Sequence, residues 1–325
     1  MNSVTSGAYT SRFAHGLMFH RFHKSGTSPL GQGSLTDVEL DRILNFVGKN
    51  RVLTPQEWLF KLKNKKLQEN DVCITFDDGL KSQLDVALPV LDCYGIKAFW
   101  FVFSSVFNGG IDRNEVYNRF ATTQFASFDE FVEEFFAFSP VPQSLLLEHG
   151  YDLYAKKLQG EYPFYSKNDL RFRFVRNKIL CKRDFESVMD GMIERSGLNV
   201  PQIARDIWLT NEDLFYLNAS GHTVGLHSYD HPFAIADLPV VEQEEQYLLN
   251  YRHINQLTGK IVECVSHPLN SYSADTIDIL LGMGIVCGFR ANMSPPRGKA
   301  INEHPLELAR EDGINILLKQ PGSDA

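Results

Sequence analysis

Continuous apolar runs alternate with amphipathic stretches over both ends of the chain. Strands are predicted where the apolar run is unbroken, at residues 16–22, 71–76, 98–103, 222–226, 261–266, 285–290 and 306–309. Helices are predicted where apolar residues recur every three or four positions, at residues 36–49, 54–62, 84–94, 211–218, 238–257 and 274–283. Thr36 followed by Glu39 is a capping box for the first helix, and Pro55 takes the favoured first position of the second. This alternation predicts a parallel sheet with helices packed outside it.

The middle of the chain has a different pattern. Residues 107–209 are dense in Phe, Tyr, Glu and Arg, with helical patterns at 128–138 and 184–196 and few strand signals. We therefore predict one α/β domain, residues 1–106 and 210–325, with a mostly helical insertion that is a candidate lid or specificity element. The two halves supply about seven strands, and no glycine-rich phosphate turn follows the first. An α/β barrel, closed or incomplete, therefore fits better than an open doubly wound sheet.

Composition and charge exclude several classes of protein. With 325 residues, 43% of them hydrophobic and 22% charged, the chain is an ordinary globular protein. A net charge of -8 without a basic run argues against binding nucleic acid or anionic membranes. No apolar run is long enough to span a membrane. The polar start resembles no secretory signal, and the five scattered cysteines suit reduced thiols, so we expect a cytoplasmic protein.

Polar clusters follow two of the predicted strands. Asp77 and Asp78 directly follow the strand at residues 71–76. They lie at its carboxyl end, where the active sites of α/β folds are found. A solvated Asp-Asp-Gly turn that caps the next helix fits this stretch equally well. His227 and His231 follow the strand at residues 222–226, and two histidines four apart can direct both imidazoles at one ion. Two imidazoles and a carboxylate leave positions open on a metal, as a catalytic site requires.

These motifs resemble the polysaccharide deacetylase family, which is also called the NodB-homology family or carbohydrate esterase family 4. The resemblance rests on TFDDG at residues 75–79 and on a strand followed by HSYDH at residues 227–231, preceded by LTNEDLFYLNASGH. It covers about residues 13–107 and 209–309 but not the insertion. It implies a distorted (β/α)7 barrel of the NodB type with a helical insertion.

The resemblance also implies roles for individual residues. Asp77 corresponds to the general base, and Asp78, His227 and His231 to the ligands of a divalent metal. Zinc is favoured as that metal, with nickel, cobalt or ferrous iron as alternatives. Ser228 would steady the histidine loop by a hydrogen bond.

The acid that protonates the leaving amine is expected near the N-terminus. The family's late Leu-x-His-like motif is missing from the C-terminal tail, whereas residues 17–20 read LMFH. This arrangement resembles a circularly permuted subgroup that includes deacetylases of poly-N-acetylglucosamine and of O-antigen or capsule biosynthesis. It implies His20 as the acid and Leu17 as part of the acetyl pocket, with His23 as the competing acid.

The family's third motif is altered in this chain. Where the family has Arg-Pro-Pro-Tyr-Gly, this sequence reads VSHPLNSY at residues 265–272, so the arginine that orients the catalytic aspartate is missing. Arg290 or Arg310, each at a strand end, could replace it. His267 and Tyr272 are expected to line the wall of the substrate groove.

The resemblance implies hydrolysis of an N-acetyl group from an amino sugar. We expect an acetamido sugar that is nucleotide-linked, lipid-linked or oligomeric, as a precursor of a bacterial O-antigen or capsule. Three rings of the insertion, Tyr162, Phe164 and Tyr165, are candidates for stacking on it. The alternatives are an amidohydrolase or deformylase acting on a related small amide, and a catalytically silent relative that binds glycans. Retention of Asp77 argues against the silent relative, because a pure binding site needs no proton acceptor.

Overall fold

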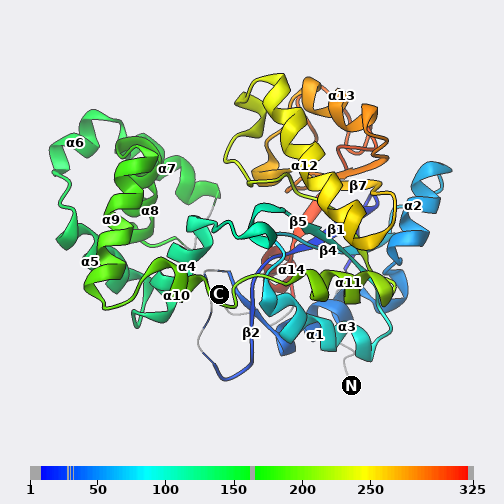
Figure 1. Cartoon of the computed structure of the whole chain (residues 1–325), viewed down its shortest axis with the longest axis horizontal. Helices are drawn as coiled ribbons and strands as arrows, with labels where there is room; N and C mark the ends of the chain where they lie inside the picture. Colours follow the sequence, from blue (N-terminus) through cyan, green and yellow to red (C-terminus); the bar gives the residue numbers. More distant parts are fainter. Residues whose placement is uncertain (1–8, 28, 30, 32, 162–164, 321–325) are drawn as a thin grey trace, which may run out of the picture. The chain divides into compact units, whose positions relative to one another are not determined.

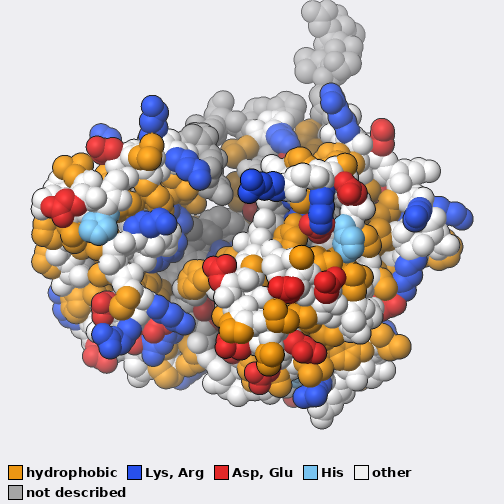
Figure 2. All heavy atoms as spheres, turned by 90° about the horizontal axis from the view of Figure 1, so that it is seen from above, with side chains coloured by type: hydrophobic (Ala, Val, Ile, Leu, Met, Phe, Trp, Pro, Cys, Tyr) orange, Lys and Arg blue, Asp and Glu red, His pale blue; other side chains and the backbone are white. Residues whose placement is uncertain are grey.

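A computed structural model of the chain describes residues 9–27, 29, 31, 33–161 and 165–320 (Figure 1). The chain divides into two compact units. The barrel unit consists of residues 1–27, 33–112 and 208–325, and the helical unit of residues 28–32 and 113–207. Figure 2 shows one face of the molecule, on which acidic side chains (red) gather at the lower centre and basic ones (blue) lie mainly above and to either side of them.

Seven parallel strands form the sheet of the barrel unit. They are β1 (His15–Phe19), β4 (Val72–Phe76), β5 (Ala98–Val102), β6 (Thr223–Leu226), β7 (Cys264–Ser266), β8 (Cys287–Phe289) and β9 (Arg310–Asp312). Their order is β8-β7-β6-β5-β4-β1-β9, and each neighbouring pair is parallel. The segment before β9 also pairs with β8, because Arg290 N–H donates to Leu308 O at 2.8 Å. This second pairing brings the sheet to a nearly closed barrel, which confirms the predicted fold class.

Helices surround this barrel. They are α1 (Asp37–Val47), α2 (Pro55–Lys63), a π-helical turn (Gln83–Ala87) that runs into α3 (Leu88–Cys93), α11 (Asn211–Ala219), α12 (Val240–Thr258), α13 (Ala274–Gly282) and α14 (Gly313–Leu318). Single 3₁₀ turns lie at Lys49–Arg51, Ser105–Asn108, Ile235–Asp237 and Pro268–Asn270. The capping box predicted at Thr36 is present, with Glu39 N–H donating to Thr36 Oγ1 at 3.1 Å. Pro55 begins α2 as predicted.

Alternating strand residues separate two apolar layers. One set of side chains packs between the strands and the helices, and the other set fills the barrel. Phe99, Phe101 and Phe289 lie in the barrel, and Trp58 of α2 packs against Phe289 with ring centroids 5.8 Å apart. Three of the five free cysteines also belong to this interior layer, while Cys93 and Cys181 are exposed.

The helical unit is built around phenylalanine. Its helices are α4 (Arg113–Thr123), α5 (Phe128–Phe138), α6 (Gln143–Glu148), α7 (Tyr151–Glu161), α8 (Lys167–Phe174), a π-helical turn (Val175–Ile179), α9 (Lys182–Arg195) and α10 (Val200–Ala204). Phe135 and Phe172 meet edge to face with centroids 5.0 Å apart. Tyr162 and Phe164 lie outside the described residues, and the Tyr165 ring is covered by the Arg173 guanidinium at 4.1 Å.

Some elements differ from the prediction. The last strand lies at Arg310–Asp312 and not at residues 306–309, and α14 and the short pair β2 (Phe22–His23) and β3 (Leu35–Thr36) were not predicted. Within the described residues, none of the helices is both long and apolar enough to cross a membrane.

Candidate metal centre and active site

Two adjacent carboxylates leave the carboxyl end of β4. Asp77 N–H donates to Phe19 O at 3.1 Å and so extends the pairing of β4 with β1. Asp78 and Gly79 then both adopt left-handed backbone conformations, with φ of 72° and 62°. This region is unfavourable for a residue with a side chain, so Asp78 is held there by its surroundings. A Cβ at Gly79 would lie 3.0 Å from Val102 Cγ1, so both φ and space favour glycine.

The two predicted histidines follow β6. His227 is buried directly after the strand, and His231 lies four residues later with its ring centroid 4.9 Å away. Ser228 and His231 also have positive φ, at 66° and 52°. His231 N–H donates to Ser228 Oγ at 3.1 Å, so the serine bridges the loop that separates the two rings.

Asp78 and the two histidines converge on one point. Asp78 Oδ1 lies 3.3 Å from His227 Nε2 and 3.5 Å from His231 Nε2. This oxygen is buried and has no hydrogen bond of normal geometry. His227 Nδ1 lies 2.8 Å from Ser266 O, and donation to that carbonyl leaves the Nε2 lone pair facing Asp78. Lone pairs directed at a buried carboxylate fit a bound cation, and among the described residues no other group of His, Cys, Asp or Glu meets this spacing.

The pKa shifts of Asp78 and His231 favour the protonation states that bind a metal. Burial alone would raise the pKa of Asp78, but the neighbouring histidines hold it well below its usual value. Burial lowers the pKa of His231 to about 4, so its imidazole is neutral at pH 7. For His227 burial is outweighed by Asp77 and Asp78, which raise its pKa. A carboxylate and a neutral imidazole are the forms that bind metals, and a bound cation would favour the neutral form of His227.

Asp77 is held by a buried arginine. Arg310 Nη1 and Nη2 donate to the two oxygens of Asp77, both at 2.7 Å, and Ser266 Oγ donates to Asp77 Oδ2 at 2.9 Å. The remaining donors of Arg310 reach Thr75 Oγ1, Ser266 Oγ and Arg290 O. Burial would raise the pKa of Asp77, but the charge of Arg310 and then that of His227 lower it to about 2.

His20 lies on β1's carboxyl end, beside the same carboxylate. Its Nε2 is 3.9 Å from Asp77 Oδ2, and 30% of its side chain is exposed. The buried Gln83 amide donates both to His20 O at 2.8 Å and to Asp77 O at 2.6 Å, which ties the two strand ends together. The competing acid, His23, instead lies with Nδ1 2.9 Å from Ser34 Oγ.

Two kinds of comparison with known proteins gave matches, one of sequence and one of structure. A sequence profile described as polysaccharide deacetylase matches residues 64–123 and 200–288. Both matched segments of the chain are therefore similar to the polysaccharide deacetylase family. No curated protein sequence matches the chain.

Solved deacetylase structures share the fold. The deacetylase PplD from Streptococcus pyogenes, solved with acetate, is 15% identical with a TM-score of 0.55 over 96% of this chain and 100% of that one. IcaB from Ammonifex degensii is 15% identical with a TM-score of 0.52 over 94% and 93%. A de-N-acetylase from Aggregatibacter actinomycetemcomitans is 13% identical with a TM-score of 0.52 over 91% and 93%.

Arg310 makes the contact with Asp77 that the family resemblance assigns to the missing motif arginine. Arg310 comes from β9 and not from the altered motif at residues 265–272. In that motif Ser266, the last residue of β7, contacts both Arg310 and Asp77. The sequence had offered Arg290 and Arg310 without deciding between them. Arg290 donates instead to Glu307 O at 2.8 Å and Asn292 Oδ1 at 3.0 Å.

The other predicted substrate residues have different surroundings. Leu17 lies in the core between strands and helices, on the face of β1 opposite Gly16, so the structure does not bring it to the metal centre. His267 is fully buried, with Nε2 2.7 Å from Leu306 O and its ring stacked on Tyr272 at 4.3 Å. Tyr272 OH donates to Glu307 at 3.0 Å. These two residues lie side by side next to β7, and His267 Nε2 and Tyr272 OH already have hydrogen-bond partners within the protein.

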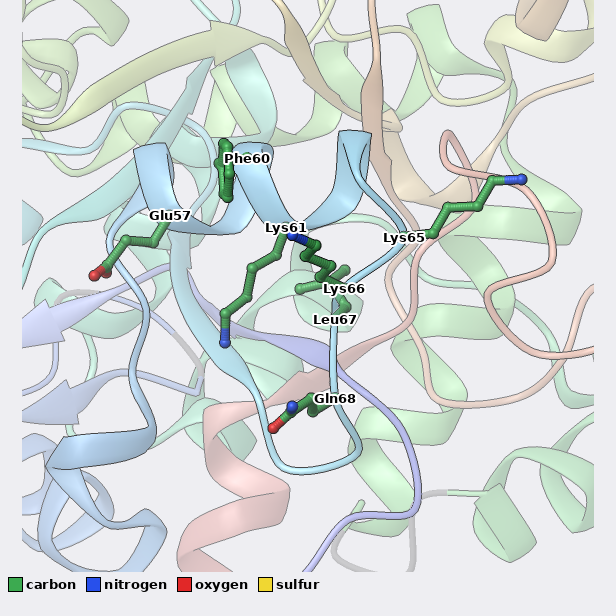
Figure 3. A pocket seen from close by; sticks show the side chains of 7 residues that line it. All are labelled: Glu57, Phe60, Lys61, Lys65, Lys66, Leu67 and Gln68. Atoms are coloured by element: carbon green, nitrogen blue, oxygen red, sulfur yellow. The ribbon is translucent and has the colours of Figure 1, made fainter.

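A surface hollow lies elsewhere on the barrel unit (Figure 3). It is lined by Glu57, Phe60, Lys61, Lys65, Lys66, Leu67 and Gln68. These residues come from α2 and the loop that enters β4, and Lys61 pairs with Asp71 at 3.0 Å. The hollow is therefore at the amino end of β4, whereas Asp77 and Asp78 follow its carboxyl end, where barrel enzymes carry their chemistry.

Proposed function

We propose that this protein is a metal-dependent hydrolase that removes an N-acetyl group from an amino sugar. The proposal is carried by the buried Asp78 Oδ1, which has no hydrogen-bond donor and faces Nε2 of His227 and of His231. Asp77, fixed by Arg310, lies on the adjoining residue. Zinc is the ion we favour, because two imidazoles and a carboxylate with open positions are typical of catalytic zinc.

Asp77 would accept the proton of the attacking water. A carboxylate with a pKa of about 2 is ionised at every physiological pH, but it is a weak base. The proton can pass to so weak a base only from a water whose own pKa is lowered. A divalent ion held by Asp78, His227 and His231 would lower that pKa and would polarise the amide carbonyl. Arg310 holds both oxygens of Asp77 in place without removing all their lone pairs.

His20 would protonate the leaving nitrogen. Its Nε2 faces Asp77 Oδ2 across 3.9 Å, a gap too long for a hydrogen bond, and the side chain is partly exposed. A proton donor must lie within about 3 Å of the atom it protonates, so the substrate amide would sit beside these two side chains, with its nitrogen within reach of His20 Nε2. His20 would thereby protonate the nitrogen of the amide whose carbonyl carbon is attacked by the water that Asp77 deprotonates.

The substrate we propose is an acetamido sugar on a nucleotide or lipid carrier, or within an oligomer, as a precursor of an O-antigen or capsule. The similar folds support an N-acetyl group as the target, since one is of a de-N-acetylase and another was solved with acetate. The resemblance to the permuted subgroup supports a surface polysaccharide as the product.

The test is acetate release from a panel of nucleotide-linked, lipid-linked and oligomeric acetamido sugars, with metal-free, zinc-loaded and Asp77→Asn protein. We expect release by the zinc-loaded protein alone. Release of formate from formamido sugars would identify a deformylase. A bound ion without turnover of any amide would refute the proposed function and leave a glycan-binding relative.

A further inference from the structure

A row of polar side chains on α12 faces the end of β6. Gln246, Asn250 and His253 are spaced four and three residues apart, so they share one face of the helix. That spacing is normally occupied by apolar residues that pack on a sheet. We infer that Gln246 and Asn250 are positioning residues that fix the ligand loop, residues 227–231, in the shape that brings both histidines to one ion. This inference rests on the proposed function.

Asn250 joins the ends of two strands. Its side chain is fully buried, and its Oδ1 accepts a hydrogen bond from His227 N–H at 2.8 Å. Its Nδ2 donates to Val102 O at 2.9 Å and to Ser104 Oγ at 2.6 Å. The residue after β6 is thereby tied to the end of β5. His253 lies on the far side of Ser104, with Nδ1 2.8 Å from Oγ.

Gln246 holds the next part of the ligand loop. Its Oε1 accepts from Tyr229 N–H at 3.1 Å and from Asp230 N–H at 2.8 Å. Its Nε2 donates to Asp230 Oδ2 at 3.2 Å. With Asn250 on His227 N–H and Ser228 Oγ on His231 N–H, four of the five backbone N–H groups of the loop are bonded to side chains.

The loop needs such bonds because its backbone is strained. Ser228 and His231 have φ of 66° and 52°, a conformation in which L-residues persist only when the surrounding structure fixes it. None of the loop's N–H groups named above bonds to another strand. Loss of the hydrogen bonds from Gln246 and Asn250 would therefore let the loop backbone relax. The two imidazoles would then separate, and Asp78 and both histidines could no longer bind the same ion.

The experiment compares Gln246→Met with Gln246→Glu and Gln243→Met. Methionine keeps the length of the side chain but removes the acceptor, and Gln246 is only partly buried, so the fold should survive. Glutamate keeps an acceptor oxygen for Tyr229 and Asp230. Gln243 is the matched control, a buried amide on α12 that bonds Leu238 O and Thr276 and does not touch the ligand loop.

Two measurements are made, neither of which uses turnover. Hydrogen exchange of the metal-free protein should be about tenfold faster at Tyr229 and Asp230 in Gln246→Met. Zinc affinity by chelator competition should fall about 10- to 100-fold. Gln246→Glu keeps the acceptor oxygen but places a second carboxylate beside Asp230 Oδ2, so it should restore only part of the protection and of the zinc affinity. Gln243→Met should lower stability without changing either.

The outcomes distinguish failure of the positioning role of Gln246 from failure of the proposed function. Unchanged exchange in Gln246→Met overturns the positioning role, and so does faster exchange with unchanged zinc affinity. A wild-type protein that binds no divalent ion overturns the proposed function instead. In that case the exchange rates still show whether α12 holds the ligand loop.

Discussion

Replacing Arg310 by methionine would leave the carboxylate of Asp77 buried without its partner. Arg310 is fully buried, and all five of its N–H donors are used, two of them on Asp77. Methionine fills a similar volume but carries neither charge nor donors. Breaking a buried pair from one side costs about 3–5 kcal/mol, because the remaining charge is uncompensated.

The pH dependence separates this mechanism from simple loss of packing. In the wild type the pKa of Asp77 is about 2 against 3.8 when unfolded, so its contribution of about 2 kcal/mol is present above pH 4 and lost only as the pH falls from 3.8 to 2. In Arg310→Met burial acts without the arginine and raises the pKa of Asp77 above 3.8. The folded variant then takes up a proton before the unfolded chain does, so its stability rises as the pH falls toward 4. The difference from the wild type should be largest at pH 7.

Denaturant unfolding at pH 4.5, 5.5 and 7 measures this difference. The double variant Asp77→Asn/Arg310→Met removes the charge together with its partner and should recover most of the lost stability. Arg310→Lys keeps a positive charge but cannot make the bidentate hydrogen bonds to Asp77. It should therefore be more stable than Arg310→Met yet still have low turnover. A loss below about 1 kcal/mol at pH 7, or one that is the same at all three pH values, would refute the reasoning.

Four further outcomes are expected. Asp77→Asn should keep the bound metal and lower turnover at least about 100-fold, because only the base is removed; loss of metal would mean that the roles of the two aspartates are exchanged. His231→Ala should weaken metal affinity strongly, and unchanged metal content by elemental analysis would remove it from the ligand set. His20→Ala should lower turnover about 100-fold at unchanged metal content, and near-normal activity would place the acid elsewhere. Burial lowers the pKa of His222 to about 4, so the unfolded chain gains a proton first and stability falls as the pH drops below 6.5. Denaturation at pH 5 and 7 should show that His222→Gln lessens this fall by about 2 kcal/mol, and an unaltered fall would contradict it.

The hydrophobic pattern was sufficient for the framework of the fold. Unbroken apolar runs marked β4 and β5 to within a residue or so, because both faces of a parallel strand are buried. The last strand was placed too early. Residues 306–309 are the apolar part of that segment, but the pairing with β1 is made by Arg310, Glu311 and Asp312. Charged residues are a poor strand signal. Arg310 and Glu311 are buried because they pair with Asp77 and Tyr9, which lie far away in the sequence.

The candidate site was predictable only where its residues are adjacent in the sequence. Asp77 with Asp78 and His227 with His231 form short motifs, and the structure brings three of these side chains to one point. The choice of Arg310 over Arg290 depends on which strand closes the barrel, and no local pattern carries that. Leu17 was assigned to the acetyl pocket by its place in a motif. Its position on β1, between the inward-facing Gly16 and Met18, makes it face the helices instead.

Closure of the barrel and pairing of Asp77 depend on the same strand, β9. Asp77 and Arg310 are 233 residues apart, and their pair is buried. Arg310 reaches Asp77 only because β9 lies beside β1, which in turn lies beside β4. Until β9 is in place, the barrel holds an unpaired carboxylate next to Asp78, and burial then opposes ionisation of Asp77. The strand that completes the sheet therefore also supplies the charge that keeps the base ionised, so a chain lacking β9 should lose the barrel's stability and the activity together.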